Sequence, residues 1–153
     1  MGGRADFTLG AFRAPALSHP VTVKDALVRS LHSGEFFLGG PAERGQKRNL
    51  GPTAVLQAGQ LMIVVSTHAT NCGDLQFYRS FGIEPTLCRL VSVKACASFR
   101  AGYEPISARI CGTATPGAAG GVLTDLPFTR LPSPLYPFAE ITEEDISAPV
   151  RYR

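Results

Sequence analysis

Short segments in which apolar and polar residues alternate begin the chain. The alternation runs through residues 5–10, ADFTLG, and again through residues 21–30, VTVKDALVRS. Pro, Ser and Gly, which favour turns, follow each segment. Alternation bounded by such residues is typical of half-buried β-strands. Together with a further extended segment at residues 35–38, the pattern predicts a β-rich part over about residues 1–60.

A hairpin is predicted at the end of this part. Residues 53–56 and 61–66 are mainly apolar, and Ala58-Gly59 lies between the two runs. A short connection that contains glycine favours a tight β-hairpin between two such runs. The preceding residues 41–52 carry basic side chains and a proline at each end, so they predict a long loop.

The pattern changes from a strand period to a helical period after residue 66. Asp74 is a suitable residue to cap a helix, and Gly82 is suitable to end it. The apolar side chains between them fall on one helical face: Leu75, Phe77, Tyr78 and Phe81. Residues 89–94 then form a β-branched run that predicts another strand. We therefore expect a strand–helix–strand part over about residues 61–115, with a parallel, right-handed crossover.

A second short helix is predicted at residues 97–103, followed by an extended stretch at residues 108–113. From about residue 116 to residue 153, Gly, Ala and Pro dominate and disfavour regular structure. We expect an extended, proline-rich strap there, anchored by apolar side chains: Phe128, Leu131, Leu135, Tyr136 and Phe138. The prediction is one domain over residues 1–153, of α/β class, with a mixed, strand-rich sheet, two short helices and the strap.

Composition places the chain among folded globular proteins, because 44% of its residues are hydrophobic and 18% are charged. A formal charge of +3 is modest. One small basic cluster, Arg44, Lys47 and Arg48, has no aromatic residues between its members, so we interpret it as a solvated loop and predict no nucleic-acid partner. The longest apolar run, residues 61–65, is too short to span a bilayer, and the N-terminus does not resemble a signal peptide. We expect no membrane association and a cytoplasmic location.

Candidate nucleophiles and metal ligands are sparse. Four cysteines occur without a CxxC pair, and we expect buried, reduced thiols: Cys72, Cys88, Cys96 and Cys111. Cys96 follows Lys94 closely enough to be activated, but no histidine follows it in the chain to act as a base. The three histidines are widely separated. The residues therefore predict neither a catalytic residue nor a metal site in this chain.

Polar residues do gather where the predicted strands end. His68 and Asn71 follow the strand at residues 61–66, Lys94 ends the next strand, and Arg100 comes shortly after it. In α/β units, ligands bind outside the carboxyl ends of strands. We expect these four residues to form a rim beside a substrate. Two alternatives stay open: ordinary polar loop residues, or an ion pair between Arg100 and Glu104 on one helical face.

Seven pieces of the chain, in order, resemble the C-terminal domain of the microcystinase C (MlrC-type) metallopeptidase family. They read GGRADFTLG at 2–10, LGPTAVL at 50–56, MIVVST at 62–67, DLQFYRSFGIEP at 74–85, LVSVKACASFRAGYEPI at 90–106, PG at 116–117 and LPFTRLPSPLYP at 126–137. The resemblance covers nearly the whole chain, from residue 2 to about residue 137.

The resemblance implies a hydrolase that uses zinc to degrade linearised microcystin and related small peptides. It also implies that the metal ligands sit in a larger N-terminal domain, in cis or on a separate chain. On this interpretation the present chain is an accessory domain with no cofactor of its own, inactive by itself, and either a truncated or a degenerate homologue. The alternative is a stand-alone, non-enzymatic module that binds a small anionic ligand through His68, Lys94 and Arg100.

The chain departs from the family pattern at the rim. The family motif after the second strand is similar to K-S-x-x-H-F-R-A, and Lys94, Phe99 and Arg100 match it. Ala95 and Ser98 stand where the family has its serine and histidine. Residues 67–71, THATN, also lack the two arginines of a family segment similar to S-R-R-x-Q. These departures count against catalysis by this copy, and we name no catalytic residue in it.

Overall fold

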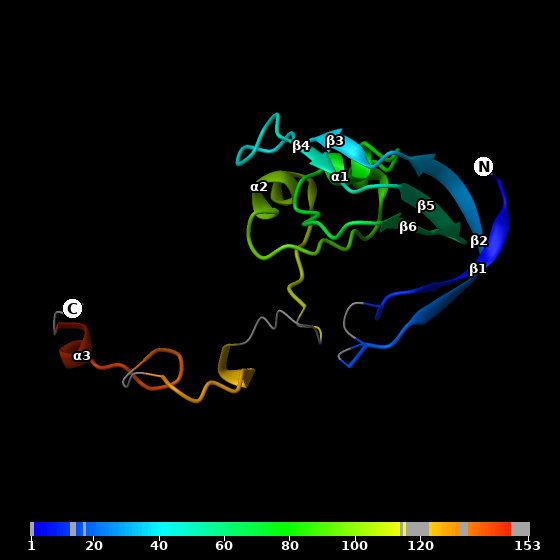
Figure 1. Ribbon diagram of the computed structural model, residues 1–153. Coiled ribbons are helices and arrows are strands. Elements are labelled where there is room, and N and C mark those ends of the chain that lie inside the picture. The colour runs from blue at the N-terminus through cyan, green and yellow to red at the C-terminus, as the bar shows by residue number, and fades with distance from the viewer. Residues whose placement is uncertain are drawn as a thin grey trace. The chain divides into compact units, whose positions relative to one another are not determined.

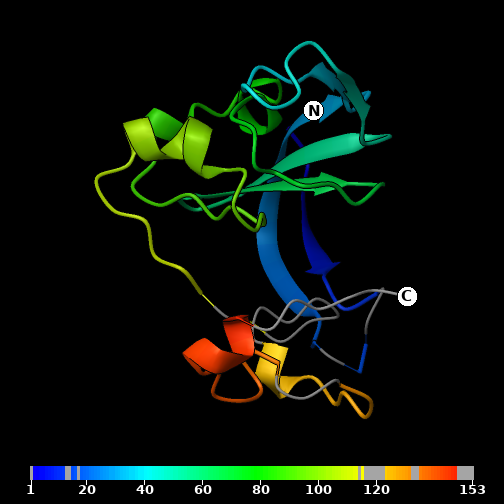
Figure 2. The same ribbon diagram turned by 90° about the vertical axis from the view of Figure 1, so that its left-hand side faces the viewer.

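Four antiparallel strands form the main sheet of the computed structural model, in the order β1-β2-β5-β6 (Figures 1 and 2). The strands are β1 (Arg4–Leu9), β2 (Val21–His32), β5 (Thr53–Ala58) and β6 (Leu61–Ser66). The alternating segments identified in the sequence are therefore strands, and the predicted strand-rich fold with few short helices is confirmed.

A bulge bends the pair formed by β1 and β2. The register shifts between Ala5 and Phe7, and Asp25 on the opposite strand has a φ of 47°. The backbone N–H of Asp25 donates a 2.8 Å hydrogen bond to the Asp6 carboxylate, and Arg4 pairs with the Asp25 carboxylate at 2.8 Å. These polar contacts hold a left-handed residue that most side chains would avoid.

The loop predicted at residues 41–52 contains a strand. Here β4 (Lys47–Asn49) pairs with β3 (Glu35–Phe37) to form a separate two-stranded antiparallel sheet. Lys47 pairs with Glu35 at 2.9 Å across this ladder. The expected hairpin between β5 and β6 is confirmed, but its two-residue turn is Gly59-Gln60, one residue later than expected, since Ala58 pairs with Leu61.

The first predicted helix is present and short. It is α1 (Gln76–Arg79), and the turn that follows it contains Gly82, whose φ of 76° suits glycine. A 3-10 turn, η1 (Pro85–Leu87), follows. Of the second predicted helix, at residues 97–103, only the last turn forms. It is α2 (Arg100–Tyr103), and it continues into η2 (Glu104–Ile106).

The predicted parallel crossover is wrong, because residues 89–94 do not form a strand. Their backbone groups bond elsewhere: the Ser92 carbonyl accepts from the Tyr78 hydroxyl at 2.5 Å, and the Lys94 N–H donates to the Cys72 sulfur at 2.8 Å. Leu90 is 88% exposed. The extended stretch expected at residues 108–113 likewise joins no sheet.

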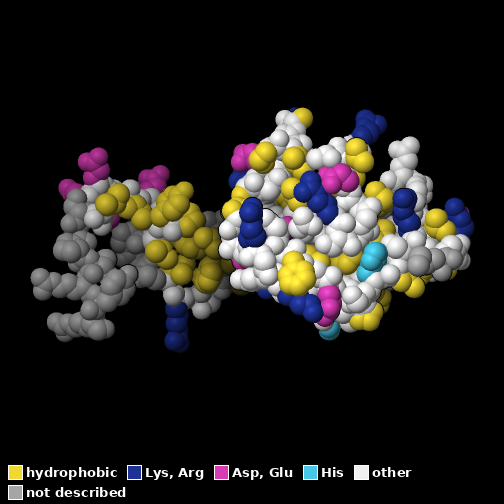
Figure 3. Space-filling view, turned by 90° about the horizontal axis from the view of Figure 1, so that it is seen from above, with side chains coloured by type: hydrophobic (Ala, Val, Ile, Leu, Met, Phe, Trp, Pro, Cys, Tyr) yellow, Lys and Arg dark blue, Asp and Glu magenta, His cyan; other side chains and the backbone are white. Residues whose placement is uncertain are grey.

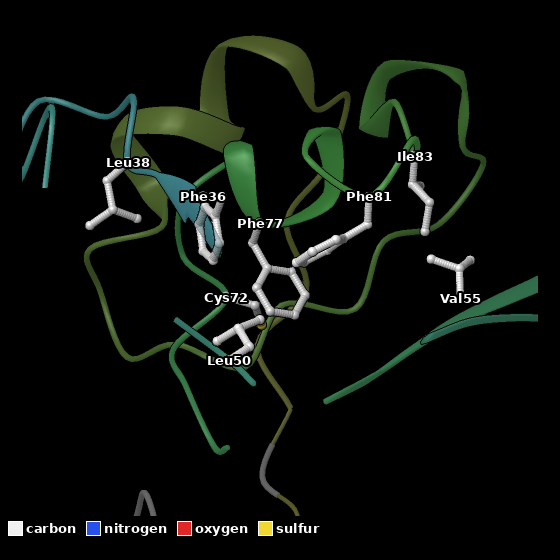
Figure 4. Packing of buried hydrophobic residues seen from close by; sticks show 8 residues of the cluster. All are labelled: Phe36, Leu38, Leu50, Val55, Cys72, Phe77, Phe81 and Ile83. Atoms are coloured by element: carbon white, nitrogen blue, oxygen red, sulfur yellow. The ribbon is translucent and has the colours of Figure 1, made fainter. Parts of the chain in front are cut away.

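The core lies between α1, the small sheet and the main sheet (Figure 4). Three rings, Phe36, Phe77 and Phe81, pack edge to face with centroid distances of 5.9 to 6.3 Å. Aromatic pairs prefer such geometry. The remaining buried members of this cluster are Leu38, Leu50, Val55, Cys72 and Ile83. The core therefore fixes the segments on either side of α1 against both sheets.

The structure describes residues 2–12, 15–16, 18–113, 115, 123–131 and 135–147. The chain divides into one unit of Met1–Leu9 with Pro20–Cys111 and another of Gly10–His19 with Gly112–Arg153. In the second unit, η3 (Leu123–Asp125) and α3 (Glu143–Ser147) are short helical elements within the predicted strap. Of its expected anchors, Phe128 and Phe138 pack edge to face with their ring centroids 5.5 Å apart, whereas Tyr136 is 76% exposed. The expected PG turn at residues 116–117, and residues 132–134 of the LPSP segment, lie outside the described residues.

Candidate functional site

A cleft of about 1010 Å³ opens in the first unit. Its walls come from the loop between β3 and β4, from the segment between β6 and α1, and from the start of α2. Arg44, Arg48, Arg79 and Arg100 line it, together with the carboxylates of Glu43 and Asp74. The volume is at the upper end of small-molecule sites. This is therefore a candidate binding site whose lining is more basic than acidic.

Asp74 fastens two walls of the cleft together. Its Oδ2 atom accepts hydrogen bonds from the N–H groups of Gly39 at 3.0 Å and Gly40 at 2.7 Å. Its Oδ1 atom accepts from the N–H of Gln76 at 2.8 Å, at the first turn of α1. The N-cap position of α1 is Leu75, one residue later than predicted, but Asp74 still binds the first turn and also anchors the β3–β4 loop.

Cys72 joins the segment before α1 to the segment before α2. Its sulfur accepts from the Lys94 N–H at 2.8 Å, and its carbonyl accepts from the Tyr103 hydroxyl at 3.2 Å. Burial raises the pKa of the Cys72 thiol and the pKa of the Tyr103 hydroxyl. Burial likewise raises the pKa of Tyr78 to about 12. Burial therefore favours the neutral forms of these groups, and the hydrogen bonds of Cys72 tie the two segments together.

Three of the four cleft arginines already have carboxylate partners. Arg48 pairs with Glu43 at 2.7 Å, and Arg100 contacts Glu104 at 3.6 Å. Arg79 donates from Nε and Nη2 to the two oxygens of Glu84, at 2.8 and 3.1 Å. The Arg79 hydrogen bonds, and after them the Thr86 N–H, lower the pKa of Glu84 to about 2. Figure 3 shows the same mixture on one face, where acidic side chains lie beside several of the basic ones.

The structure places the four predicted rim residues in two groups. Asn71 and Arg100 line the cleft, whereas His68 and Lys94 are not among its described lining residues. His68 is exposed and lies beside Gly51, and its N–H donates to the Leu50 carbonyl at 2.8 Å. Lys94 is also exposed, and its backbone N–H donates a hydrogen bond to the Cys72 sulfur. The roles of these four residues beside a substrate stay predictions.

Arg100 forms the ion pair with Glu104 that the sequence left open as an alternative. Besides Glu104, its guanidinium lies over the Phe99 ring, 5.6 Å from the centroid. Both side chains of the ion pair are more than half exposed, and such pairs are weak. Asn71 uses its Oδ1 atom to accept from the Gly73 N–H at 2.7 Å.

The expectation of four buried thiols is wrong for two of them. Cys72 is buried and Cys88 partly buried, but Cys96 and Cys111 are exposed, because the segments that carry them join no sheet. All four are free thiols. Among the described residues no cluster of three or more His, Cys, Asp or Glu side chains could hold a metal ion. None of the described helices combines the length and apolar character needed to cross a membrane.

Arg44 and the two glycines at positions 39 and 40 line the cleft but were not among the predicted rim residues. Arg44 was expected in a solvated basic loop. A signal was available, because Gly39-Gly40-Pro41 directly precedes the basic cluster and is typical of a shaped loop. No local sequence pattern indicated the hydrogen bonds from Gly39 and Gly40 to Asp74, which lies more than 30 residues later in the chain.

No curated protein matches this chain. It is similar to the crystal structure of a "Putative metallopeptidase" from Mesorhizobium sp. BNC1, with 24% sequence identity and a TM-score of 0.73 over 92% of this chain. The chain spans 28% of the length of that protein. Since the family model described as MlrC C-terminus matches residues 1–130, the chain belongs to the MlrC C-terminus family.

Proposed function

We propose that this chain is the accessory C-terminal domain of an MlrC-type metallopeptidase. The observation that carries the proposal is that the family match covers residues 1–130. The solved structure of similar fold is described as a "Putative metallopeptidase", and it is several times longer than the matched region. An accessory domain of this kind would work beside a larger metal-binding domain, in cis or as a separate chain.

The described side chains support a model in which the metal ligands lie in the larger domain and this chain contributes to binding. Zinc takes several His, Cys, Asp or Glu ligands that converge on one point, and the described part of this chain offers no such cluster. We therefore assign zinc, which the family resemblance implies, to the larger domain. When bound there, zinc would supply the Lewis acid and the activated water for peptide hydrolysis.

The residues of this chain would contribute to binding rather than to bond cleavage. The proposed substrate is a small peptide such as linearised microcystin, and the proposed compartment is the cytoplasm. Arg100 and Asn71 line the cleft and are the stronger of the four candidates for contact with a substrate. His68 and Lys94 are the weaker candidates, because both lie outside the described lining.

A two-part activity experiment tests this proposal. The chain is assayed for hydrolysis of a linear peptide by itself and in one polypeptide with an MlrC-type metal-binding domain. We expect no turnover from the chain alone and turnover from the two-domain protein. A matched protein that contains only the metal-binding domain is the control. Equal activity with and without the present chain would contradict an accessory role.

A further inference from the structure

The cleft carries positive charge that its own carboxylates do not fully balance. Four arginines line it against Glu43 and Asp74. Asp74 already accepts three backbone hydrogen bonds, from Gly39, Gly40 and Gln76. Glu43 is paired with Arg48. The two carboxylates are thus occupied, and neither is paired with Arg44 or Arg100 within the described residues.

Arg44 differs from the other three arginines. Its Nε atom donates to the Gly39 carbonyl at 3.2 Å, and it has no carboxylate partner among the described residues. This hydrogen bond fixes one side of the guanidinium to the loop wall. The terminal nitrogens make no hydrogen bond within the described residues. A guanidinium held in this way presents a planar pair of donors.

Neutral donors line the same cleft. The Ser98 hydroxyl makes no hydrogen bond within the described part of the chain, and the Asn71 amide uses its oxygen for the Gly73 N–H. The Arg100 charge is only loosely engaged, at 3.6 Å from Glu104. The cleft therefore offers four groups to a ligand: the terminal nitrogens of Arg44, the weakly paired guanidinium of Arg100, the Ser98 hydroxyl and the Asn71 amide nitrogen.

We propose that this cleft binds a small carboxylate-bearing molecule, with Arg44 as the bidentate anchor and Arg100 as the second cation. Planar carboxylates match the guanidinium fork, and such charge-assisted pairs are the strong ones. The negative charges of Glu43 and Asp74 in the same walls disfavour a highly charged polyanion. The inference concerns the same cleft as the proposed substrate contacts, but its test uses this chain alone and needs no catalysis.

Titration of the isotope-labelled chain followed by NMR tests the inference. The probes are succinate, the neutral analogue succinamide, and inorganic phosphate. We expect succinate to shift the backbone signals of cleft residues such as Gly39, Gly40 and Gly73. We expect succinamide to leave them unchanged. We expect phosphate to bind more weakly than succinate, because its negative charge is concentrated on one group close to the carboxylates of Glu43 and Asp74. The absence of succinate shifts at millimolar concentration, equal binding of succinamide, or equal binding of phosphate would each overturn the proposal.

Substitutions at one position identify the anchor. R44A should weaken succinate binding at least about tenfold, because a charge-assisted bidentate contact is lost. R44K keeps the charge without the fork and should fall between R44A and the unchanged chain. R29A is the matched control, since Arg29 lies on β2, donates to Gln57 at 2.8 Å and does not line the cleft. Equal succinate affinity in R44A and R29A would overturn the assignment of Arg44.

Discussion

The carboxylate of Asp74 accepts a 2.7 Å hydrogen bond from the backbone N–H of Gly40, 34 residues earlier in the chain. The same Oδ2 atom accepts from Gly39, and Oδ1 accepts from Gln76. One side chain therefore holds the loop after β3, the first turn of α1 and the wall of the cleft in a single arrangement.

Replacing Asp74 by alanine should destabilise the protein by about 2 kcal/mol or more, because three partly buried N–H groups lose a charged acceptor. D74N keeps one carbonyl oxygen and should lie between D74A and the unchanged protein. The matched control is E35A, which removes an exposed ion pair with Lys47 and should cost less than about 1 kcal/mol. Urea unfolding measures all three, and a D74A loss no larger than that of E35A would contradict the role of Asp74.

Glycine at position 34 is required by its conformation and by its close neighbours. Its φ is 82°, and an added Cβ would lie 2.0 Å from the Gly51 carbonyl oxygen. G34A should therefore cost more than about 2 kcal/mol. The control is G59A, where φ is also positive. A Cβ added at Gly59 would meet no atom within 4 Å. This variant should therefore lose only the stability that the backbone preference of glycine supplies, about 1–2 kcal/mol. Equal unfolding free energies for the two variants would show that the close contact is absent.

Alkaline pH should destabilise the first unit through Tyr78. Burial raises the pKa of this hydroxyl from 10.0 to about 12, so the folded state favours its neutral form. The stabilisation is complete below pH 10 and is lost as the pH rises through 12. Y78F lacks this titration, and the gap in unfolding free energy between wild type and Y78F should narrow over that range. A gap that stays constant from pH 8 to pH 12 would contradict the assignment.

The thiols should react in the order of their exposure. Cys96 and Cys111 are exposed and should be alkylated first, whereas Cys72 is buried with a raised pKa. Peptide mapping by mass spectrometry after timed alkylation distinguishes the sites. Cys72 should react only when urea is added. Labelling of Cys72 as fast as Cys96 in native conditions would contradict the packing around the Lys94 N–H.

Local patterns were sufficient to predict the strands of the main sheet and the hairpin between β5 and β6, but not that all its strands run antiparallel. Val55 and Val64 pair across the hairpin of β5 and β6, as their apolar runs and the intervening glycine indicated. The run at residues 90–93 is likewise rich in Val and Leu but forms no strand. Residue preference for strands reflects packing against neighbours, and here the backbone bonds to Tyr78 and Cys72 instead.

The candidate site was only partly predictable for a related reason. Asn71 and Arg100 were found because they follow predicted elements and do line the cleft. Lys94 was placed with them through the crossover that does not form. Arg44 reaches the cleft because Asp74 holds the loop at Gly39 and Gly40, a contact between distant residues that no local pattern encodes.

The zinc content of the purified chain tests the central claim most directly. The measurement is inductively coupled plasma mass spectrometry after equilibration with a small excess of zinc and removal of the unbound ion. An accessory domain whose metal site lies in a partner domain should retain far less than one zinc per chain. One tightly bound zinc per chain, accompanied by turnover of a linear peptide, would contradict the account.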